Sequence, residues 1–209
     1  MKPTLFFDLD GTLIDSADAI TRCVAYAFER IDEPLPDAAE LRRWLGPPLR
    51  DSFRTVLHDE ARIERAIGFY RERFDAVGCT EHRLYDGIGA AIERLSDRGH
   101  RVAVVTAKNE PHARRIVAGF DFAHHFDTIV GATLDGRVSH KPELIGEAMA
   151  RLALHAHECV MIGDRHLDID GARHHSMRAI GVLWGFGTPE ELAHADALVN
   201  SPQDLIAAM

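Results

Sequence analysis

The strongest constraint on the fold is an alternation of strand-like and helical patterns along most of the chain. Short apolar runs typical of buried strands occupy residues 4–9, 101–107, 127–132, 158–164 and 178–184. Between these runs the apolar residues recur at helical spacing, as they do at Ile88, Ile92 and Leu95. Parallel strands joined by crossover helices produce this order. The sequence therefore predicts an open parallel sheet of the α/β class.

One long interval interrupts the alternation. From about residue 15 to residue 85 no run is convincingly strand-like. Apolar residues at helical spacing predict one helix within residues 20–31 and another within residues 63–77. The segment Gly46-Pro47-Pro48 cannot lie inside a helix, so a further helix is expected to begin after it.

This helical interval is too long for an ordinary connection between two strands. We therefore expect residues 15–85 to form a small, all-helical cap domain inserted after the first strand. Residues 1–14 and 86–209 are expected to form the α/β core. The alternative is a single α/β domain with one oversized helical connection, which differs only in whether the helices move as a unit.

Composition and charge argue against several classes of partner. The formal net charge of −9 disfavours nucleic acid, because phosphate backbones are bound by clustered Lys and Arg. The three cysteines, Cys23, Cys79 and Cys159, are far apart and odd in number, so no disulfide framework is expected. No apolar stretch is long enough to span a bilayer, and the first residues lack the layout of a signal peptide. We therefore expect a cytoplasmic protein that binds neither membranes nor nucleic acid.

Polar residues follow or end several of the predicted strands. They are Asp8 and Asp10 at the end of the first strand, Thr106 at the end of the second, and Asp164 at the end of the fourth, with Asp168 one helical turn later. Lys141 stands at a predicted helix start, directly before a proline. Because ligands of open α/β sheets bind beyond the carboxyl ends of the strands, we expect these side chains to share one site.

The residue types in this set suit phosphoryl transfer. Side chains alternate along a strand, so Asp8 and Asp10 project to the same side and repel each other unless a cation or a proton lies between them. Carboxylate oxygens are ligands for Mg²⁺, and a carboxylate can also attack phosphorus to form an aspartyl-phosphate. Lys141, Thr106 and the backbone amides of residues 9–11 could position and neutralise the phosphoryl group.

Four segments resemble, in the same order, the four motifs of the haloacid dehalogenase-like (HAD) hydrolase superfamily. They are DLDGTL at residues 8–13, VVTAK at 104–108, HKPEL at 140–144 and GDRHLD at 163–168. The segments GPPLRDSF at residues 46–53 and IGVLWGFGTPEEL at 180–192 are most similar to the phosphoglycolate phosphatase-like branch. The resemblance covers essentially the whole chain and implies a Rossmann-like core with an inserted helical cap.

The resemblance also implies catalytic roles. Asp8 matches the nucleophile, which is phosphorylated and then hydrolysed. Asp10 matches the acid and base that protonates the leaving alcohol and then activates water. Thr106 matches the hydroxyl that binds the phosphoryl group, and Lys141 matches the lysine that holds both the nucleophile and that group.

By the same resemblance, the cofactor is Mg²⁺. Its direct ligands would be Asp8, the backbone carbonyl of Asp10, and Asp164, while Asp168 would support the metal from nearby.

Weaker candidates for substrate binding lie next to the motifs and in the cap. Gly11, Ala107 and Lys108 are motif neighbours. Arg50 lies just after Gly46-Pro47-Pro48, and an arginine suits a planar anion such as a carboxylate or a second phosphate. A solvated helix face is the competing interpretation of Arg50.

Together these features predict a Mg²⁺-dependent phosphatase for a small phosphomonoester, with phosphoglycolate as the leading substrate. A nucleotidase or a pyrophosphatase of the same family, and a sugar-phosphate mutase of the same fold, are the alternatives. A dehalogenase is disfavoured because displacing halide from carbon needs neither Asp10 as an acid nor a metal at Asp164. A protein that only binds a regulator would be expected to lack Asp8 or Asp10. Oligomeric state is left open.

Other kinds of site are not supported. The 13 histidines lack the paired spacing of a zinc site, so surface histidines are the better interpretation. The GFG segment at residues 185–187 lacks the third glycine of a dinucleotide-binding fingerprint, and no Gly-x-Ser-x-Gly elbow is present.

Overall fold

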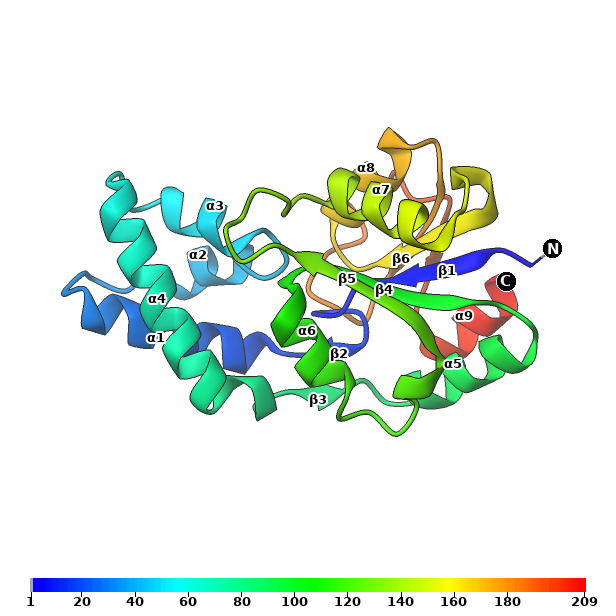
Figure 1. Cartoon of the computed structure of the whole chain (residues 1–209), viewed down its shortest axis with the longest axis horizontal. Helices are drawn as coiled ribbons and strands as arrows, with labels where there is room; N and C mark the ends of the chain where they lie inside the picture. Colours follow the sequence, from blue (N-terminus) through cyan, green and yellow to red (C-terminus); the bar gives the residue numbers. More distant parts are fainter. Residues whose placement is uncertain (1) are drawn as a thin grey trace.

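The computed structural model describes residues 2–209. Its core is a six-stranded β-sheet with helices packed on both faces (Figure 1). The strand order is β5-β4-β1-β6-β7-β8, and every neighbouring pair is parallel. The strands are β1 Thr4–Phe7, β4 Val102–Asn109, β5 Phe126–Ala132, β6 Cys159–Gly163, β7 Arg178–Val182 and β8 Ala197–Val199. The predicted open parallel sheet of the α/β class is thereby confirmed, and β8 is a strand that the sequence analysis missed.

Helices cover both faces of this sheet. They are α5 Ile88–Asp97, α6 Glu110–Val117, α7 Lys141–Leu152, α8 His166–His174 and α9 Pro202–Ala208. Figure 1 shows α7 and α8 on one face, with α5, α6 and α9 on the other. In β1, Phe6 packs into the apolar cluster that contains residues of α7 and α8, whereas Leu5 and Phe7 pack into the opposite cluster. Burial on both faces is why Leu5, Phe6 and Phe7 of β1 are all apolar.

The central position of β1 determines where the polar strand ends meet. Phe7 lies beside Val104 of β4 on one side and Ile162 of β6 on the other. All three strands run in the same direction, so their carboxyl ends reach the same edge of the sheet. Asp8, Thr106 and Asp164 lie at that edge.

The long interval after β1 is helical in its interior. It contains α1 Ala17–Arg30, α2 Ala38–Arg43, α3 Leu49–Arg54, α4 Glu60–Ala76 and a short 3₁₀ helix, Gly78–Thr80. At its two ends β2 Ile14–Asp15 pairs antiparallel with β3 Arg83–Leu84. The expectation that no strand lies between residues 15 and 85 was therefore wrong at the margins, because two-residue strands are too short to show a periodic pattern.

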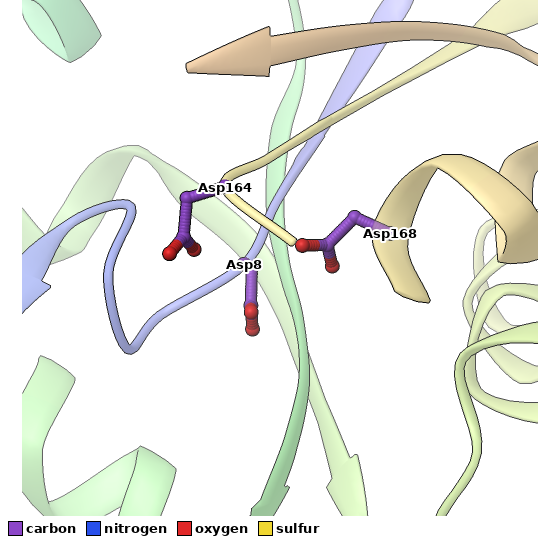
Figure 2. A group of neighbouring side chains, drawn as sticks. All are labelled: Asp8, Asp164 and Asp168. Atoms are coloured by element: carbon purple, nitrogen blue, oxygen red, sulfur yellow. The ribbon is translucent and has the colours of Figure 1, made fainter. Parts of the chain in front are cut away.

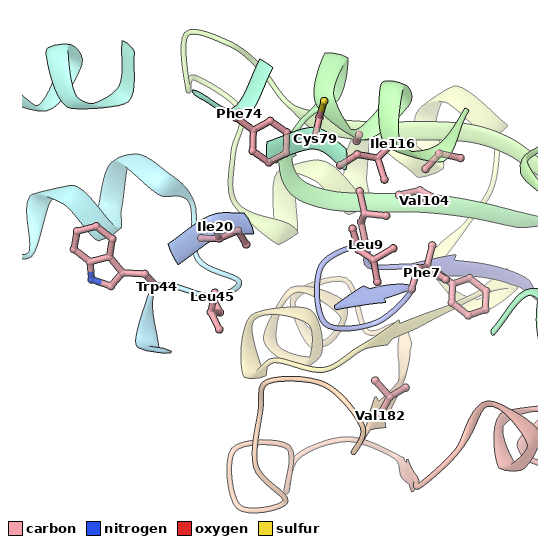
Figure 3. Packing of buried hydrophobic residues seen from close by; sticks show 14 of the residues in the cluster. Phe7, Leu9, Ile20, Trp44, Leu45, Phe74, Cys79, Val104, Ile116 and Val182 are labelled. Carbon is pink, nitrogen blue, oxygen red and sulfur yellow. The ribbon is translucent and has the colours of Figure 1, made fainter. Parts of the chain in front are cut away.

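Apolar contacts join the inserted helices to the sheet. Phe28, Trp44 and Phe53 form an aromatic group whose ring centroids lie 5.2–5.9 Å apart. Figure 3 shows Ile20 and Leu45 between this region and the residues of β1. All of them belong to one continuous cluster of buried residues.

Two further features of the helices bear on the sequence analysis. Val77, which was assigned to the apolar face of a helix, lies just past the end of α4 and is 43% exposed. Across residues 2–209, no helix combines the length and the apolar character needed to cross a membrane.

Candidate active site

Asp8 lies directly after β1 and is almost completely buried. Its backbone N–H donates to Ile162 O at 2.9 Å, which continues the pairing with β6. Its Oδ1 accepts a hydrogen bond of 2.7 Å from the backbone N–H of Leu9 and lies 2.8 Å from Lys141 Nζ. The strand end and the lysine therefore fix the orientation of this carboxylate.

Lys141 is the first residue of α7, and its ammonium group is buried among oxygen atoms. Besides Asp8, Nζ contacts Asp168 Oδ1 at 2.7 Å and donates to Val105 O at 2.8 Å. Burial opposes the charge, but Asp168 and Asp8 more than compensate and raise the pKa of Lys141 above its usual value. Gly171 in α8 permits this packing, because a Cβ there would lie 2.6 Å from Lys141 Cβ.

Three buried carboxylates meet at this point. Asp8, Asp164 and Asp168 each offer an oxygen within 4.8 Å of the others. Figure 2 shows Asp8 between Asp164, from the end of β6, and Asp168, from the first turn of α8. Burial raises the pKa of Asp8 to about 6 although Lys141 opposes the shift, and burial together with Asp168 and Asp8 raises the pKa of Asp164 strongly. The cluster thus carries an excess of negative charge that a cation or protons would relieve.

Asp164 is held by groups that the sequence analysis did not identify. Thr12 Oγ1 donates to Asp164 Oδ1 at 3.0 Å, and the backbone N–H of Phe186 donates to Asp164 Oδ2 at 2.8 Å. Gly11 has a left-handed φ of +81°, and a Cβ on it would lie 2.1 Å from Asp164 Oδ2. Gly11, predicted to bind substrate, therefore packs against the side chain of Asp164.

The loop after β7 wraps around Asp164. A Cβ on Gly185 would lie 2.2 Å from Gly11 O and 2.4 Å from Asp164 Cβ, and one on Gly187 would lie 2.0 Å from Asp164 O. Trp184 Nε1 donates to Thr12 O at 3.1 Å and ties this loop to the one after β1. In the sequence, the GFG segment at residues 185–187 was considered as part of the family resemblance and as a dinucleotide-binding motif, but not as a loop that packs against Asp164.

Asp10 is near the cluster but has different partners. Its Oδ1 accepts a hydrogen bond of 2.6 Å from Ser16 Oγ, and its Oδ2 lies 2.9 Å from Lys108 Nζ. The side chain of Lys108 also lies over the ring of Phe74 in α4, with Nζ 4.7 Å from the ring centroid. The Asp10 carboxylate is thus turned toward the inserted helices rather than toward the three clustered carboxylates.

Thr106 is buried at the point where β4 becomes irregular. The pairing of β4 with β5 shifts register between Thr106 and Asn109. Thr106 Oγ1 accepts a hydrogen bond of 3.2 Å from the backbone N–H of Lys108. Val104 and Val105 pack into the apolar clusters on either face of the sheet, whereas Thr106, Ala107 and Lys108 line the cavity described below.

A cavity of about 100 Å³ lies between the strand ends and the inserted helices. On the core side its walls include Asp8, Asp10, Thr106, Ala107 and Lys108. On the other side they include Trp44, Pro48, Arg50, Ile67, Tyr70 and Arg71. The inserted helices thus form the wall of the cavity that faces Asp8.

Arg50 lies in the cavity wall and is mostly buried. It forms an ion pair with Glu64 of α4. The competing interpretation, a solvated helix face, does not describe its position.

Comparison with known proteins identifies the family. The model of haloacid dehalogenase-like hydrolases matches residues 5–182. A crystal structure of a predicted phosphatase from Clostridium acetobutylicum superposes with a TM-score of 0.94 and 39% identity, and the match covers 100% of this chain and 98% of that one.

Several curated proteins are similar over most of the chain. A 5'-nucleotidase of Pseudomonas aeruginosa is 44% identical over 91% of this chain and 86% of its own length. A phosphoglycolate phosphatase of Colwellia psychrerythraea is 27% identical over 91% and 88%. Tyrosine-protein kinase PtkA of Mycobacterium tuberculosis is 39% identical over 88% of this chain, which spans only 62% of that protein. The chain therefore belongs to the haloacid dehalogenase-like hydrolase family, and it is a phosphatase of that family.

Proposed function

We propose that this protein is a Mg²⁺-dependent phosphatase that hydrolyses a small phosphomonoester through an aspartyl-phosphate at Asp8. The observation that carries the proposal is the position of Asp8. It is a buried carboxylate, paired with Lys141, within a cluster of three acids at the base of a small cavity. Such a site can hold an anionic phosphoryl group only if positive charge offsets the acids.

The first half of the reaction would form the intermediate. Asp8 Oδ1 is engaged by Leu9 and Lys141, so we assign the attack on phosphorus to Oδ2. The new Oδ2–P bond forms as the ester P–O bond breaks, and Asp10 gives a proton to the departing alkoxide. Asp10 lines the same cavity as Asp8, which suits a group that must reach the leaving oxygen.

The second half would regenerate the enzyme. Asp10, now a carboxylate, takes a proton from a water molecule that attacks phosphorus. The Oδ2–P bond breaks, inorganic phosphate leaves and Asp8 is free again. Throughout, Thr106 would bind the phosphoryl oxygens, and Lys141 would hold Asp8 in place and offset its charge.

The donor set suits a hard divalent cation. Asp8, Asp164 and Asp168 supply carboxylate oxygens. Burial and the neighbouring carboxylates raise the pKa of Asp8 and of Asp164, and a bound cation would favour the charged form of both. Asp8, Asp164 and the backbone carbonyl of Asp10 would hold Mg²⁺, with Asp168 in support. When bound, the metal would supply Lewis-acid stabilisation of the phosphoryl oxygens.

Phosphoglycolate is the leading proposal for the substrate, supported by the size of the cavity and by the similarity to a phosphoglycolate phosphatase. A 5'-nucleotidase activity is the second candidate, because a relative with that name is 44% identical to this chain. We also propose a cytoplasmic location, which the three free, buried cysteines support. The inserted helices are proposed to act as a cap, whose closure would exclude water from the site.

The test is phosphate release from a panel of esters with Mg²⁺ and with EDTA. The panel contains phosphoglycolate, nucleoside monophosphates, sugar phosphates and pyrophosphate. Turnover should require Mg²⁺ and should be lost in Asp8→Asn, which keeps the shape of the side chain but removes the nucleophile. Asp18→Asn, an exposed change in α1, is the matched control.

Two outcomes would contradict the proposal. Turnover that persists in EDTA or in Asp8→Asn would exclude the mechanism. Accumulation of a stable phosphoenzyme, together with turnover that requires a bisphosphate activator, would favour a sugar-phosphate mutase instead.

A further inference from the structure

The wall of the cavity opposite Asp8 carries two arginines. Arg50 comes from α3 and Arg71 from α4, and both line the cavity. Their charges are close enough that Arg50 acts on Arg71. Burial and the positive charge of Arg50 lower the pKa of Arg71 below its usual value. Two guanidinium groups in the wall of one small cavity repel each other, which costs free energy unless an anion lies between or beside them.

Among residues 2–209, only Arg50 of these two arginines has a carboxylate at ion-pair distance; Asp75 acts on Arg71 from farther away. Arg50 pairs with Glu64. Arg71 donates from Nη2 to Leu134 O at 2.8 Å, and no carboxylate among residues 2–209 lies within ion-pair distance of it. Its Nε is buried and has no hydrogen-bond partner in the described part of the chain. A buried donor left unpaired costs free energy, so a ligand that accepts from it would be favoured.

Two other arginines of α4 have acidic partners. Arg62 lies 2.7 Å from Glu33, and Arg73 lies 2.8 Å from Glu81. Two arginines of this helix, Arg65 and Arg71, have no carboxylate of residues 2–209 at ion-pair distance. Arg65 is exposed to solvent, whereas Arg71 lines the cavity.

We propose that Arg71, with Arg50 beside it, binds a second anionic group, carried by the leaving group of the phosphomonoester. The inference rests on the proposed function and narrows its substrate class. The substrate would carry a phosphate at the Asp8 end and a carboxylate or a second phosphate at the Arg71 end. A guanidinium suits either group, because its planar fork donates hydrogen bonds to two oxygens at once. A nucleoside monophosphate has no such second anion and would leave Arg71 unpaired.

Three esters on one two-carbon skeleton separate these possibilities. They are 2-hydroxyethyl phosphate, which is neutral at the far end, phosphoglycolate, which has a carboxylate there, and ethane-1,2-diol bisphosphate. We expect kcat/KM for at least one charged ester to exceed that for the neutral ester by about tenfold or more. The better of the two charged esters identifies whether the site prefers carboxylate or phosphate.

Arg71→Met tests the residue itself. It keeps an unbranched side chain of similar length but removes every N–H donor. The ratio of kcat/KM for the charged ester over the neutral ester should fall about tenfold or more. Arg71→Lys, which retains the charge but not the fork, should restore part of the ratio. A substitution that acted only through folding would lower kcat/KM for both esters equally and leave their ratio unchanged. That result would overturn the inference.

The matched control is Arg65→Met, an exposed arginine of the same helix. Its ratio should equal that of the wild type.

A binding experiment separates failure of this inference from failure of the proposed function. In Asp8→Asn, calorimetry should show tighter binding of the charged ester than of the neutral one, and adding Arg71→Met should abolish the difference. If the wild type released no phosphate from any ester but this difference remained, the proposed function would be wrong and the anion site would stand. Equal binding of both esters in Asp8→Asn would refute the anion site.

Discussion

At the scale of single residues, the glycines around Asp164 are the positions where a side chain would fit least well. Gly185 approaches both Gly11 O and Asp164 Cβ so closely that any side chain would displace one of them. Phe186, the next residue, supplies the N–H that holds Asp164 Oδ2. The orientation of a proposed metal ligand thus depends on the absence of one Cβ atom.

Gly185→Ala should therefore weaken Mg²⁺ binding. Loss of an outer partner of a metal ligand typically lowers affinity by 10- to 100-fold, so we expect a loss of about tenfold or more. The measurement is the dependence of Tm on Mg²⁺ concentration without substrate. Unchanged Mg²⁺ dependence would mean that the loop does not position Asp164.

The acidic and basic residues of the site could be predicted from sequence, but the groups that hold Asp164 could not. Asp8, Lys141 and Asp164 stand at strand ends or a helix start, and parallel strands bring such positions together. Thr12 reaches Asp164 across 152 positions of sequence, and Phe186 contributes only its backbone. Neither contact leaves a periodic signal, because both depend on how two loops pack; the glycines beside Phe186 allow a close approach but do not identify its partner.

At the level of secondary-structure elements, long strands could be predicted from the sequence pattern and very short ones could not. The five predicted strands have at least four residues each, whereas β2, β3 and β8 have only two or three. A strand that short cannot be distinguished from a turn by its pattern. The end of α4 was also misplaced, because Val77 continues the helical spacing although the helix stops at Ala76.

Helix α4 offers a prediction of its own at Gly68. This glycine lies in the helix interior, and no atom of the described residues, beyond its chain neighbours and its own helix, comes within 4 Å of the position that a Cβ would occupy. Glycine in a helix interior costs about 0.5–1 kcal/mol relative to alanine. Gly68→Ala should raise the free energy of unfolding by about that amount, and Tm by about 1–4 °C in calorimetry. A lower Tm would show that the position is not free.

At the scale of the whole molecule, the buried carboxylates should couple stability to pH. Burial raises the pKa of Asp8 from 3.8 to about 6. The folded protein then holds this proton more tightly than the unfolded chain does. Without metal, the stability contributed by this group is complete below about pH 4 and is lost as the pH rises through about 6.

Mg²⁺ should reverse that loss, because it binds the deprotonated carboxylates of the folded state. We expect the increase in Tm on adding Mg²⁺ to be small at about pH 5, where protons compete for Asp8 and Asp164, and larger at about pH 7.5. Scanning calorimetry at both pH values, with and without Mg²⁺, measures it, and Asp8→Asn should reduce the increase while Asp18→Asn should not. An increase that is equal at the two pH values, or larger at the lower one, would show that Mg²⁺ does not displace protons from these carboxylates, and the assignment of the metal to this cluster would fail.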